Sequence, residues 1–249
     1  MKKLFFILIT IICAAVEVPA QDLLQSANDA YAKGDYAKAV EFYEAALKEN
    51  GQSAAVYYNL GNSYYKANKI APSILNYERA LLLEPGNGDI RFNLEIAKLK
   101  TVDKIEPIGE FFLTSWFRSV EDSMSTDAWS KFAIVCFIFL IVSLFLFFFS
   151  RKIGIKKVGF YAGICLLVLT ILGNIFAYNQ KKSLTQRDSA IIFVPTTTIK
   201  SSPADSGTDL FILHEGAKVK LKSKIGNWNE IETADGNIGW IKSEEIAVI

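Results

Sequence analysis

Two long runs of apolar residues dominate the hydropathy pattern of the chain. The first, residues 132–149, holds 18 residues without a charge, and 15 of them are Phe, Ile, Leu or Val. As a helix it would be about 27 Å long, close to the ~30 Å hydrocarbon core of a bilayer. The second run, residues 158–178, is less hydrophobic because it contains the polar residues Thr170 and Asn174. Both runs predict membrane-spanning helices, and the buried helical hairpin of a soluble protein is the alternative.

The connection between the two runs, residues 150–157, is short and basic. Its charged residues are Arg151, Lys152, Lys156 and Lys157. Short loops rich in Lys and Arg stay on the cytoplasmic side of a membrane. The pattern therefore predicts a two-pass protein of a bacterial cytoplasmic (inner) membrane, with the chain on either side of the hairpin in the periplasm.

The first 20 residues have the parts of a secretory signal peptide. Two lysines precede an apolar stretch from Leu4 to Ala15, and Val18-Pro19-Ala20 provides the small residues that precede a cleavage site. The apolar stretch is too short to remain as a span. We therefore expect residues 1–20 to be removed on export, in agreement with a periplasmic N-terminal domain.

Residues 102–131 link the N-terminal region to the first run and contain a short helical pattern. Apolar residues follow Pro107 at i, i+3 and i+4 spacing. They are Phe112, Leu113, Trp116, Phe117 and Val120. With Trp129 just before the span, the pattern is typical of an amphipathic helix in the membrane interface. Packing against the N-terminal domain is the alternative. Ser125 is expected to cap the first spanning helix.

Residues 21–101 contain an internal repeat of 34 residues, seen when residues 20–53 are laid over 54–87. Matching pairs are Ala27 and Gly61, Tyr43 and Tyr77, and Leu47 and Leu81. Small residues let antiparallel helices approach closely, while larger ones fill the seam between them at i, i+4 spacing. Residues 88–101 are more polar and are expected to close the array as a capping helix.

This repeat resembles the tetratricopeptide repeat, most clearly in NLGNSYYK (59–66), GDYAKAVEFYEAAL (34–47) and ERALLLEP (78–85). The resemblance implies an α-helical solenoid with a partner-binding groove along the first helix of each repeat. The groove positions are Asn28, Tyr31, Tyr58, Asn59, Asn62, Tyr65, Lys66, Phe92 and Asn93. Asparagine amides offer donors and acceptors to an extended backbone, and tyrosines add apolar surface. The alternative is that the asparagines only cap or bridge helices.

Residues 185–249 change to short alternating segments with turn signals between them. Many short strands in about sixty residues favour a small β-barrel. The segments KSSPADSGTDLFILHEGAKVKL and GNWNEIETADGNIGWIKSEEI resemble bacterial SH3-like domains. Trp228 and Trp240 are either packing residues or a ligand-binding face. His214, the one histidine of the chain, is expected in a loop before a turn.

Small residues in the spans predict close helix packing. Gly159 and Gly163 are four residues apart, and in an antiparallel hairpin they would lie near Ser143 of the first span. We expect this contact within the chain, and a dimer face or a contact with another membrane protein is the alternative.

Composition argues against several function classes. With 27 Lys+Arg against 26 Asp+Glu, the chain lacks the excess of basic residues that is typical of nucleic-acid-binding proteins. The three cysteines, Cys13, Cys136 and Cys165, lie in the signal and the spans, so neither a disulfide framework nor a zinc site is expected in the exported parts. We expect no cofactor, no metal and no catalytic residue, and therefore no enzyme.

The order of these parts is similar to that in a membrane protein of the Bacteroides aerotolerance (Bat) group, over essentially all of the mature chain. The likeness implies a non-catalytic scaffold beside von Willebrand A-type membrane proteins and a MoxR-type ATPase system, in envelope or stress-related maintenance. A cell-wall sensor whose SH3-like domain binds peptidoglycan is the alternative function.

Overall fold

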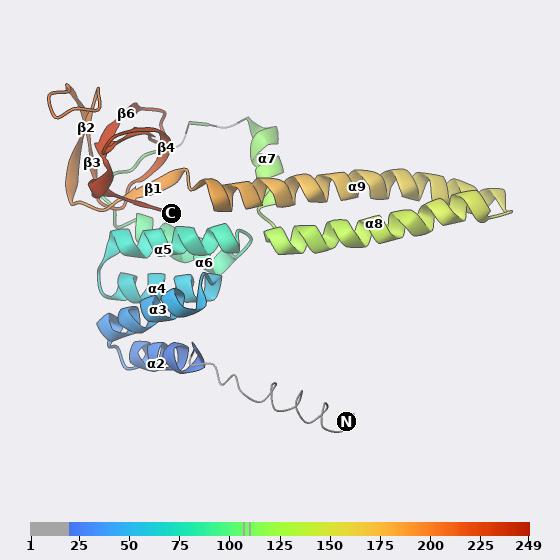
Figure 1. Cartoon of the computed structure of the whole chain (residues 1–249), viewed down its shortest axis with the longest axis horizontal. Coiled ribbons are helices and arrows are strands. Elements are labelled where there is room, and N and C mark those ends of the chain that lie inside the picture. Colours follow the sequence, from blue (N-terminus) through green and yellow to red (C-terminus); the bar gives the residue numbers. More distant parts are fainter. Residues whose placement is uncertain (1–19, 107, 110) are drawn as a thin grey trace, which may run out of the picture.

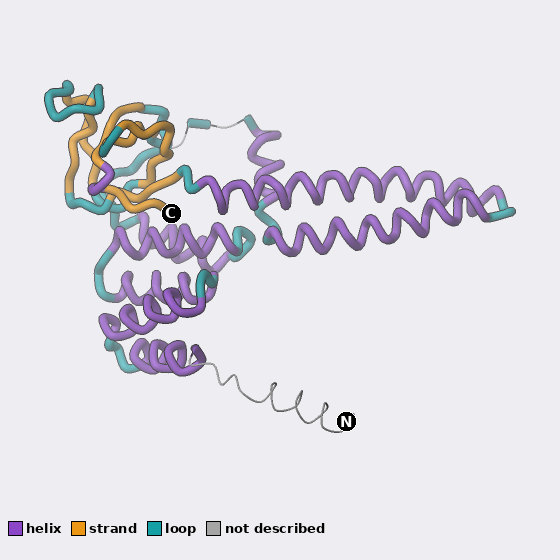
Figure 2. Tube along the Cα trace, viewed as in Figure 1, coloured by secondary structure: helices purple, strands orange, loops and turns teal. Residues whose placement is uncertain are grey.

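The computed structural model describes residues 20–106, 108–109 and 111–249, and the described chain has three parts (Figure 1). Antiparallel helices form the N-terminal part, a long helical hairpin projects to one side, and a curled sheet forms the C-terminal part. The sheet packs against the helical array at the base of the hairpin (Figure 2). The predicted signal peptide, apart from Ala20, falls outside the described residues.

The N-terminal array repeats one helical hairpin after 34 residues. Its helices are α2 (Ala20–Ala32), α3 (Tyr36–Asn50), α4 (Ala54–Lys66), α5 (Ile70–Leu83) and α6 (Gly88–Lys98). Tyr43 in α3 and Tyr77 in α5 are both buried in the seam between helices. A methyl group on Gly61 would come within 2.7 Å of the Tyr77 ring, so the close approach of α4 and α5 requires glycine at this position.

Helix α6 follows the second repeat and packs against α5. The side chain of Asn87 caps it by accepting hydrogen bonds from the backbone N–H groups of Asp89 and Ile90. Ile90, Leu94 and Ala97 are buried in one core cluster with residues of α5, whereas the opposite side of α6 is mostly polar, apart from the exposed Phe92. A helix with one apolar face is sufficient to cover the last repeat.

The hairpin consists of α8 (Thr126–Phe149) and α9 (Ile153–Gln186), both long and apolar enough to cross a membrane. At 1.5 Å per residue, α8 is about 36 Å long and α9 about 51 Å. Ser125 caps α8 by accepting from the Ala128 N–H, which confirms the predicted N-cap. Both helices extend past the predicted runs, and α9 continues without a break to Gln186, so only Arg187 and Asp188 separate it from the sheet.

The C-terminal part is an antiparallel sheet of seven strands among the described residues. They are β1 (Ser189–Ile192), β2 (Thr196–Lys200), β3 (Asp209–His214), β4 (Lys218–Ile225), β5 (Trp228–Glu232), β6 (Ile238–Lys242) and β7 (Ile246–Val248), with the 3-10 turn η1 (Ser243–Glu245) before the last. The strand order is β3-β2-β6-β5-β4-β1-β7. Strands β3 and β7 are the two edges, so backbone pairing does not close the sheet into a barrel.

The sheet and the helical array share one hydrophobic core. Ile191 of β1 and Ile249 are buried in the same cluster as Ile74 and Leu75 of α5. At the edge of this contact, a guanidinium nitrogen of Arg79 donates to the Val248 carbonyl at 2.7 Å. The two soluble parts therefore form a single body.

The linker between the array and helix α7 (Phe112–Glu121) packs on the sheet, which the sequence pattern did not predict. The Ile105 side chain joins the sheet core, and the Ile108 N–H donates to the Ala234 carbonyl at 3.1 Å. The expectation that His214 lies in a loop was wrong. His214 ends β3, and its backbone N–H and ring Nδ1 lie 2.6 and 2.9 Å from the carboxylate oxygens of Asp103, which belongs to this linker.

Candidate functional site

The concave side of the repeat array contains a cavity of about 320 Å³. Its walls come from α2, α4, α5 and α6, because the first helices of successive repeats line up along this side. The lining residues are Tyr31, Tyr58, Asn62, Tyr65, Lys66, Tyr77, Asn93 and Ile96. Four tyrosines and two asparagines thus surround one small, partly polar cavity.

Asparagine–tyrosine bridges hold each repeat together at equivalent positions. The Tyr43 hydroxyl donates to Asn28 Oδ1 at 2.6 Å, and the Tyr77 hydroxyl donates to Asn62 Oδ1 at the same distance. Both pairs are 15 residues apart in sequence and join the two helices of one repeat. The side-chain oxygen atoms of Asn28 and Asn62 therefore bridge helices, which is the alternative role that we considered for these residues.

The third asparagine connects the second repeat to the capping helix. The amide nitrogen of Asn93 donates to the Tyr58 hydroxyl at 2.9 Å and to Asn62 Oδ1 at 3.0 Å. Asn62 Oδ1 thus accepts from both Tyr77 and Asn93. This network fixes the orientation of the Asn62 and Asn93 amides at the cavity wall.

The network leaves one donor group and one acceptor on two residues that line the same cavity. Within the described part of the chain, neither Asn62 Nδ2 nor Asn93 Oδ1 makes a hydrogen bond. A peptide group in an extended segment offers one carbonyl and one N–H, which are the complementary groups. The tyrosine rings around them provide apolar surface, so the cavity suits a short stretch of backbone with an apolar side chain.

Burial keeps the tyrosines of this site in the neutral, hydrogen-bonding form. It raises the pKa values of the hydroxyls of Tyr31, Tyr43 and Tyr77 above that of a free tyrosine. For Tyr31 the neighbouring Tyr36 acts in the same direction. These hydroxyls therefore remain donors at neutral pH.

A basic rim adjoins the cavity. Lys66 is exposed at the end of α4, and the ammonium group of Lys100 lies 4.2 Å from the centre of the Tyr65 ring. This distance is typical of a cation–π contact, which orders Lys100 beside the opening.

Six of the nine predicted groove residues line the cavity, and three do not. Asn28 is exposed and bonds to Tyr43, Asn59 is half-buried beside the wall, and Phe92 is 66% exposed on α6. The prediction missed Tyr77 and Ile96, which complete the lining. The 34-residue period contained the signal for Ile96, because this residue stands in the capping helix where Asn28 and Asn62 stand in the repeats.

A second cavity, of about 420 Å³, lies beside one of the predicted tryptophans of the sheet. It is lined by Asp205, Asn227, Trp228, Lys242, Ser243 and Glu244. The Lys242 ammonium group lies 5.5 Å from the centre of the Trp228 ring and 2.8 Å from an Asp205 oxygen. Trp240 is half-buried and does not line this cavity. The two tryptophans therefore do not form one shared ligand face.

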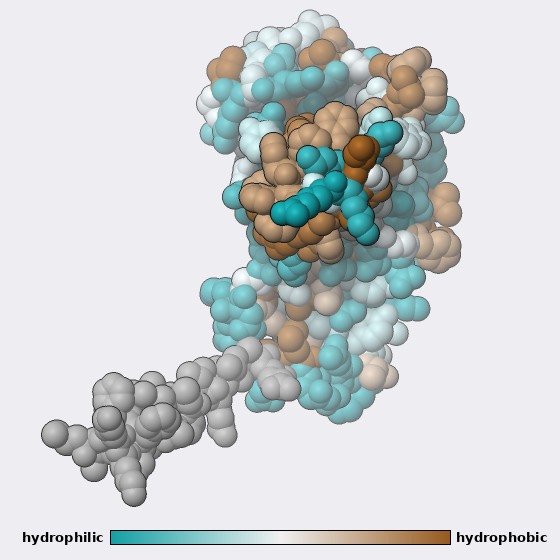
Figure 3. Space-filling model, turned by 90° about the vertical axis from the view of Figure 1, so that its right-hand side faces the viewer, coloured by the Kyte–Doolittle hydropathy of each residue, from teal (hydrophilic) through white to brown (hydrophobic). Residues whose placement is uncertain are grey.

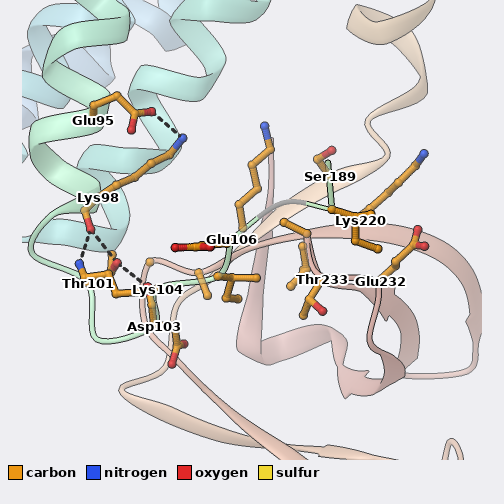
Figure 4. A pocket seen from close by; sticks show the side chains of 18 of the residues that line it. Glu95, Lys98, Thr101, Asp103, Lys104, Glu106, Ser189, Lys220, Glu232 and Thr233 are labelled. Carbon is orange, nitrogen blue, oxygen red and sulfur yellow. Dashed lines mark hydrogen bonds and ion pairs between the residues drawn. The ribbon is translucent and has the colours of Figure 1, made fainter. Parts of the chain in front are cut away.

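A larger open cleft, of about 1270 Å³, separates α6 and the linker from the sheet. Figure 4 shows Glu95 and Lys98 on its helical side, with Lys220 and Glu232 on the sheet. Lys98 pairs with Glu95 at 3.2 Å, and Lys104 donates to the carbonyls that end α6. Acidic and basic side chains alternate around the cleft, so its charge favours neither an anionic nor a cationic ligand.

The predicted packing residues of the hairpin lie together inside the chain. The Ser143 hydroxyl of α8 donates to the Gly159 carbonyl of α9 at 2.7 Å. A methyl group on Gly159 would come within 2.9 Å of the backbone of α8, and Gly163 is buried opposite the Ser143 side chain. These small residues face the partner helix of the hairpin, so they are not available as a contact surface for another chain.

The comparisons with known proteins bear on the repeat array. Residues 30–75 match the tetratricopeptide repeat family. The match extends from the end of α2 to the first turns of α5, and it includes Tyr31, Tyr58, Asn62 and Tyr65 of the cavity. No curated protein matches the chain. The helical N-terminal region is therefore similar to tetratricopeptide repeats over residues 30–75, and it is joined to two apolar helices and a seven-stranded antiparallel sheet among the described residues.

Proposed function

We propose that this protein is a membrane-anchored, non-catalytic scaffold of the bacterial envelope that holds an extended segment of a partner protein in its repeat groove. The observation that carries this proposal is the cavity in which Asn62 Nδ2 and Asn93 Oδ1 are oriented by the Tyr58 and Tyr77 bridges. Tetratricopeptide repeats are interaction modules, and the site presents groups for binding a backbone without a nucleophile or an acid–base pair.

The hairpin is the membrane anchor in this proposal. Between residues 132–149 and 158–178 its outward side chains are mostly apolar, whereas its tip carries the basic residues Arg151, Lys152, Lys156 and Lys157. Figure 3 looks onto the tip, where hydrophilic atoms are surrounded by hydrophobic ones. The shared core of α5 and β1 requires both soluble parts to lie on the same side of any membrane that the hairpin crosses. With the basic tip in the cytoplasm, that side is the periplasm.

Within the Bat resemblance, the order of parts is that of a BatE-type protein. The partners are then von Willebrand A-type membrane proteins and the MoxR-type ATPase system of the same group. The curved antiparallel sheet and its buried core support an SH3-like module, although β3 and β7 remain unpaired edges. Tethering to the membrane raises the local concentration of partners, so a weak groove contact is sufficient for assembly.

Site-specific crosslinking tests the groove. A photoreactive amino acid at position 66, on the rim, is introduced into the chain in its native membrane, and the crosslinked products are compared between variants. Asn62→Ala combined with Asn93→Ala should abolish the products, because both free amide groups are lost. Asn59→Ala is the matched control, since Asn59 lies outside the cavity. Unchanged products in the folded double variant would contradict the groove assignment.

Thiol labelling tests the membrane arrangement. Single cysteines at Gly154, in the first turn of α9 near the hairpin tip, and at Ser206, in the β2–β3 turn, are exposed to a membrane-impermeant reagent on spheroplasts. We expect labelling at 206 and protection at 154. Labelling at 154 from outside would reverse the proposed orientation.

The cavity beside Trp228 favours a second candidate function, the binding of cell-wall peptidoglycan. A tryptophan ring beside amide and charged groups is suited to glycan or peptide ligands. The test is retention of the detergent-solubilised chain on purified cell wall, because the sheet shares its core with α5 and is not an independent unit. Saturable retention that Trp228→Ala removes and Trp240→Ala preserves would support wall binding, and no retention would exclude it.

A further inference from the structure

Helix α7 (Phe112–Glu121) exposes a large apolar surface for a helix of ten residues. Phe112 is 68% exposed, Trp116 58% and Phe117 48%, and none of the helix residues is buried. At 100° per residue, Phe112, Leu113, Trp116, Phe117 and Val120 fall on one side of the helix, with Thr114, Ser115 and Arg118 on the other. Such a face normally packs against another apolar surface.

The C-terminal end of α7 is fixed to the base of the hairpin. The ring N–H of Trp129 donates to the Glu121 carbonyl at 2.8 Å. The Gln180 amide of α9 donates to the carbonyls of Glu121 and Met124, at 2.6 and 2.7 Å. Trp129 and Gln180 are both buried, so these hydrogen bonds are shielded from water. The position of α7 relative to the hairpin is therefore set by the structure.

This position is the level at which the apolar span begins. Trp129 lies in the first turn of α8, just before residues 132–149. Figure 1 shows α7 lying across the direction of α8 and α9, so it runs along the surface of a membrane that the hairpin crosses. None of the α7 residues is buried, so among the described residues the repeat array does not cover its aromatic face.

We propose that α7 is a third membrane contact, which lies in the interfacial layer of the same bilayer with its aromatic face in the lipid. The inference rests on the proposed membrane anchor and adds a function to the segment between the repeats and the hairpin. The occupant is the lipid surface because α7 is fixed at the base of the hairpin, where the apolar span begins, and its exposed face has the aromatic composition of interfacial helices.

The docked helix also orients the repeat groove. The turn after α7 packs against the loop between α5 and α6, where a methyl group on Gly86 would come within 2.6 Å of the Ser123 carbonyl oxygen. Arg91 of α6 lies close enough to Asp122 to interact with its charge. Since α7, this turn and the repeat array are in contact, a membrane-bound α7 holds the groove at one angle to the bilayer.

Spin labels measure the depth of α7. The chain carries Cys136→Ala and Cys165→Ala, is placed in lipid nanodiscs, and receives a label at Phe117→Cys or, as the matched control on the polar side of the helix, at Ser115→Cys. We expect the label at 117 to be accessible to oxygen and protected from a water-soluble nickel complex, and the label at 115 to show the reverse. Equal nickel access at both sites would overturn the proposal, and so would a label at 117 protected from both reagents, which indicates a protein partner or a second copy.

A second readout is protease protection, measured on the chain with its native cysteines retained. Phe112→Glu with Phe117→Glu should lower the protection of α7 from added protease in nanodiscs, whereas Ser115→Glu should leave it unchanged. Thiol labelling at 154 and 206, as above, reports on the hairpin alone. A two-pass hairpin with an unprotected α7 would refute the inference and leave the proposed function intact, whereas a hairpin that does not cross would refute both.

Discussion

Helices α3 and α5 occupy the same place in successive repeats, yet they have different surroundings. In α3 the buried residues are Ala39, Tyr43 and Ala46, all directed into the repeat seam. In α5 the buried set is much larger and includes Ile74, Leu75 and Glu78. The difference arises because the sheet covers the outer face of α5, while the outer face of α3 is open.

Two glutamates at equivalent positions of α3 and α5 show how strongly the sheet changes the surroundings of a residue. Glu44 of α3 is exposed and accepts a hydrogen bond from the Tyr64 hydroxyl. Glu78 of α5 is 7% exposed, with Lys218 of the sheet at 2.7 Å and Lys98 of α6 at 3.6 Å. The same residue type in the same repeat frame is a surface group in one helix and an inter-domain ion pair in the other.

The largest effect is expected at the shared core. Ile74→Ala should lower the free energy of unfolding by about 3 kcal/mol, because Ile74 is fully buried and contacts both the array and the sheet. Val40→Ala, the equivalent change in α3, should cost about 1 kcal/mol, since Val40 is only partly buried. Denaturant unfolding of the detergent-solubilised chain measures both. Equal losses would mean that the sheet does not stabilise α5.

The ion pair should give a smaller difference. Glu78→Ala removes the carboxylate between two lysines and should cost about 1.5 kcal/mol, less than a fully buried pair because both lysines can turn to water. Glu44→Ala should cost about 0.5 kcal/mol. Combining Glu78→Ala with Lys218→Ala in a double-mutant cycle isolates the contact with the sheet, and strictly additive losses would refute the coupling.

The smallest difference is expected for the two seam hydroxyls. Tyr77→Phe should cost about 1 kcal/mol, because Asn62 is half-buried and loses one of its two donors. Tyr43→Phe should cost about 0.5 kcal/mol, since the exposed Asn28 can bond to water instead. The crosslinking assay extends the comparison: products should weaken with Tyr77→Phe and persist with Tyr43→Phe.

The groove illustrates how far a repeat period can be used for prediction. The resemblance to tetratricopeptide repeats implied that Asn62, Tyr65 and Asn93 are groove residues, and all three line the cavity. It also implied Asn28 and Phe92, which lie outside the cavity, because a position in the repeat gives the helix face of a residue but not the place where that face is hollow. The cavity depends on how α4 and α6 approach each other, and only the packed structure defines that distance.

Local patterns in the sequence determined the repeat helices, the two apolar helices and the strands, since each is set by the periodicity of apolar residues and by turn and cap signals. The tertiary structure alone decided that Ile191 and Ile249 complete the core of α5, that Asp103 meets His214, and that α7 keeps its aromatic face uncovered. These features join residues that are distant in the chain. Their pairing depends on the three-dimensional path of the backbone, which no local period encodes.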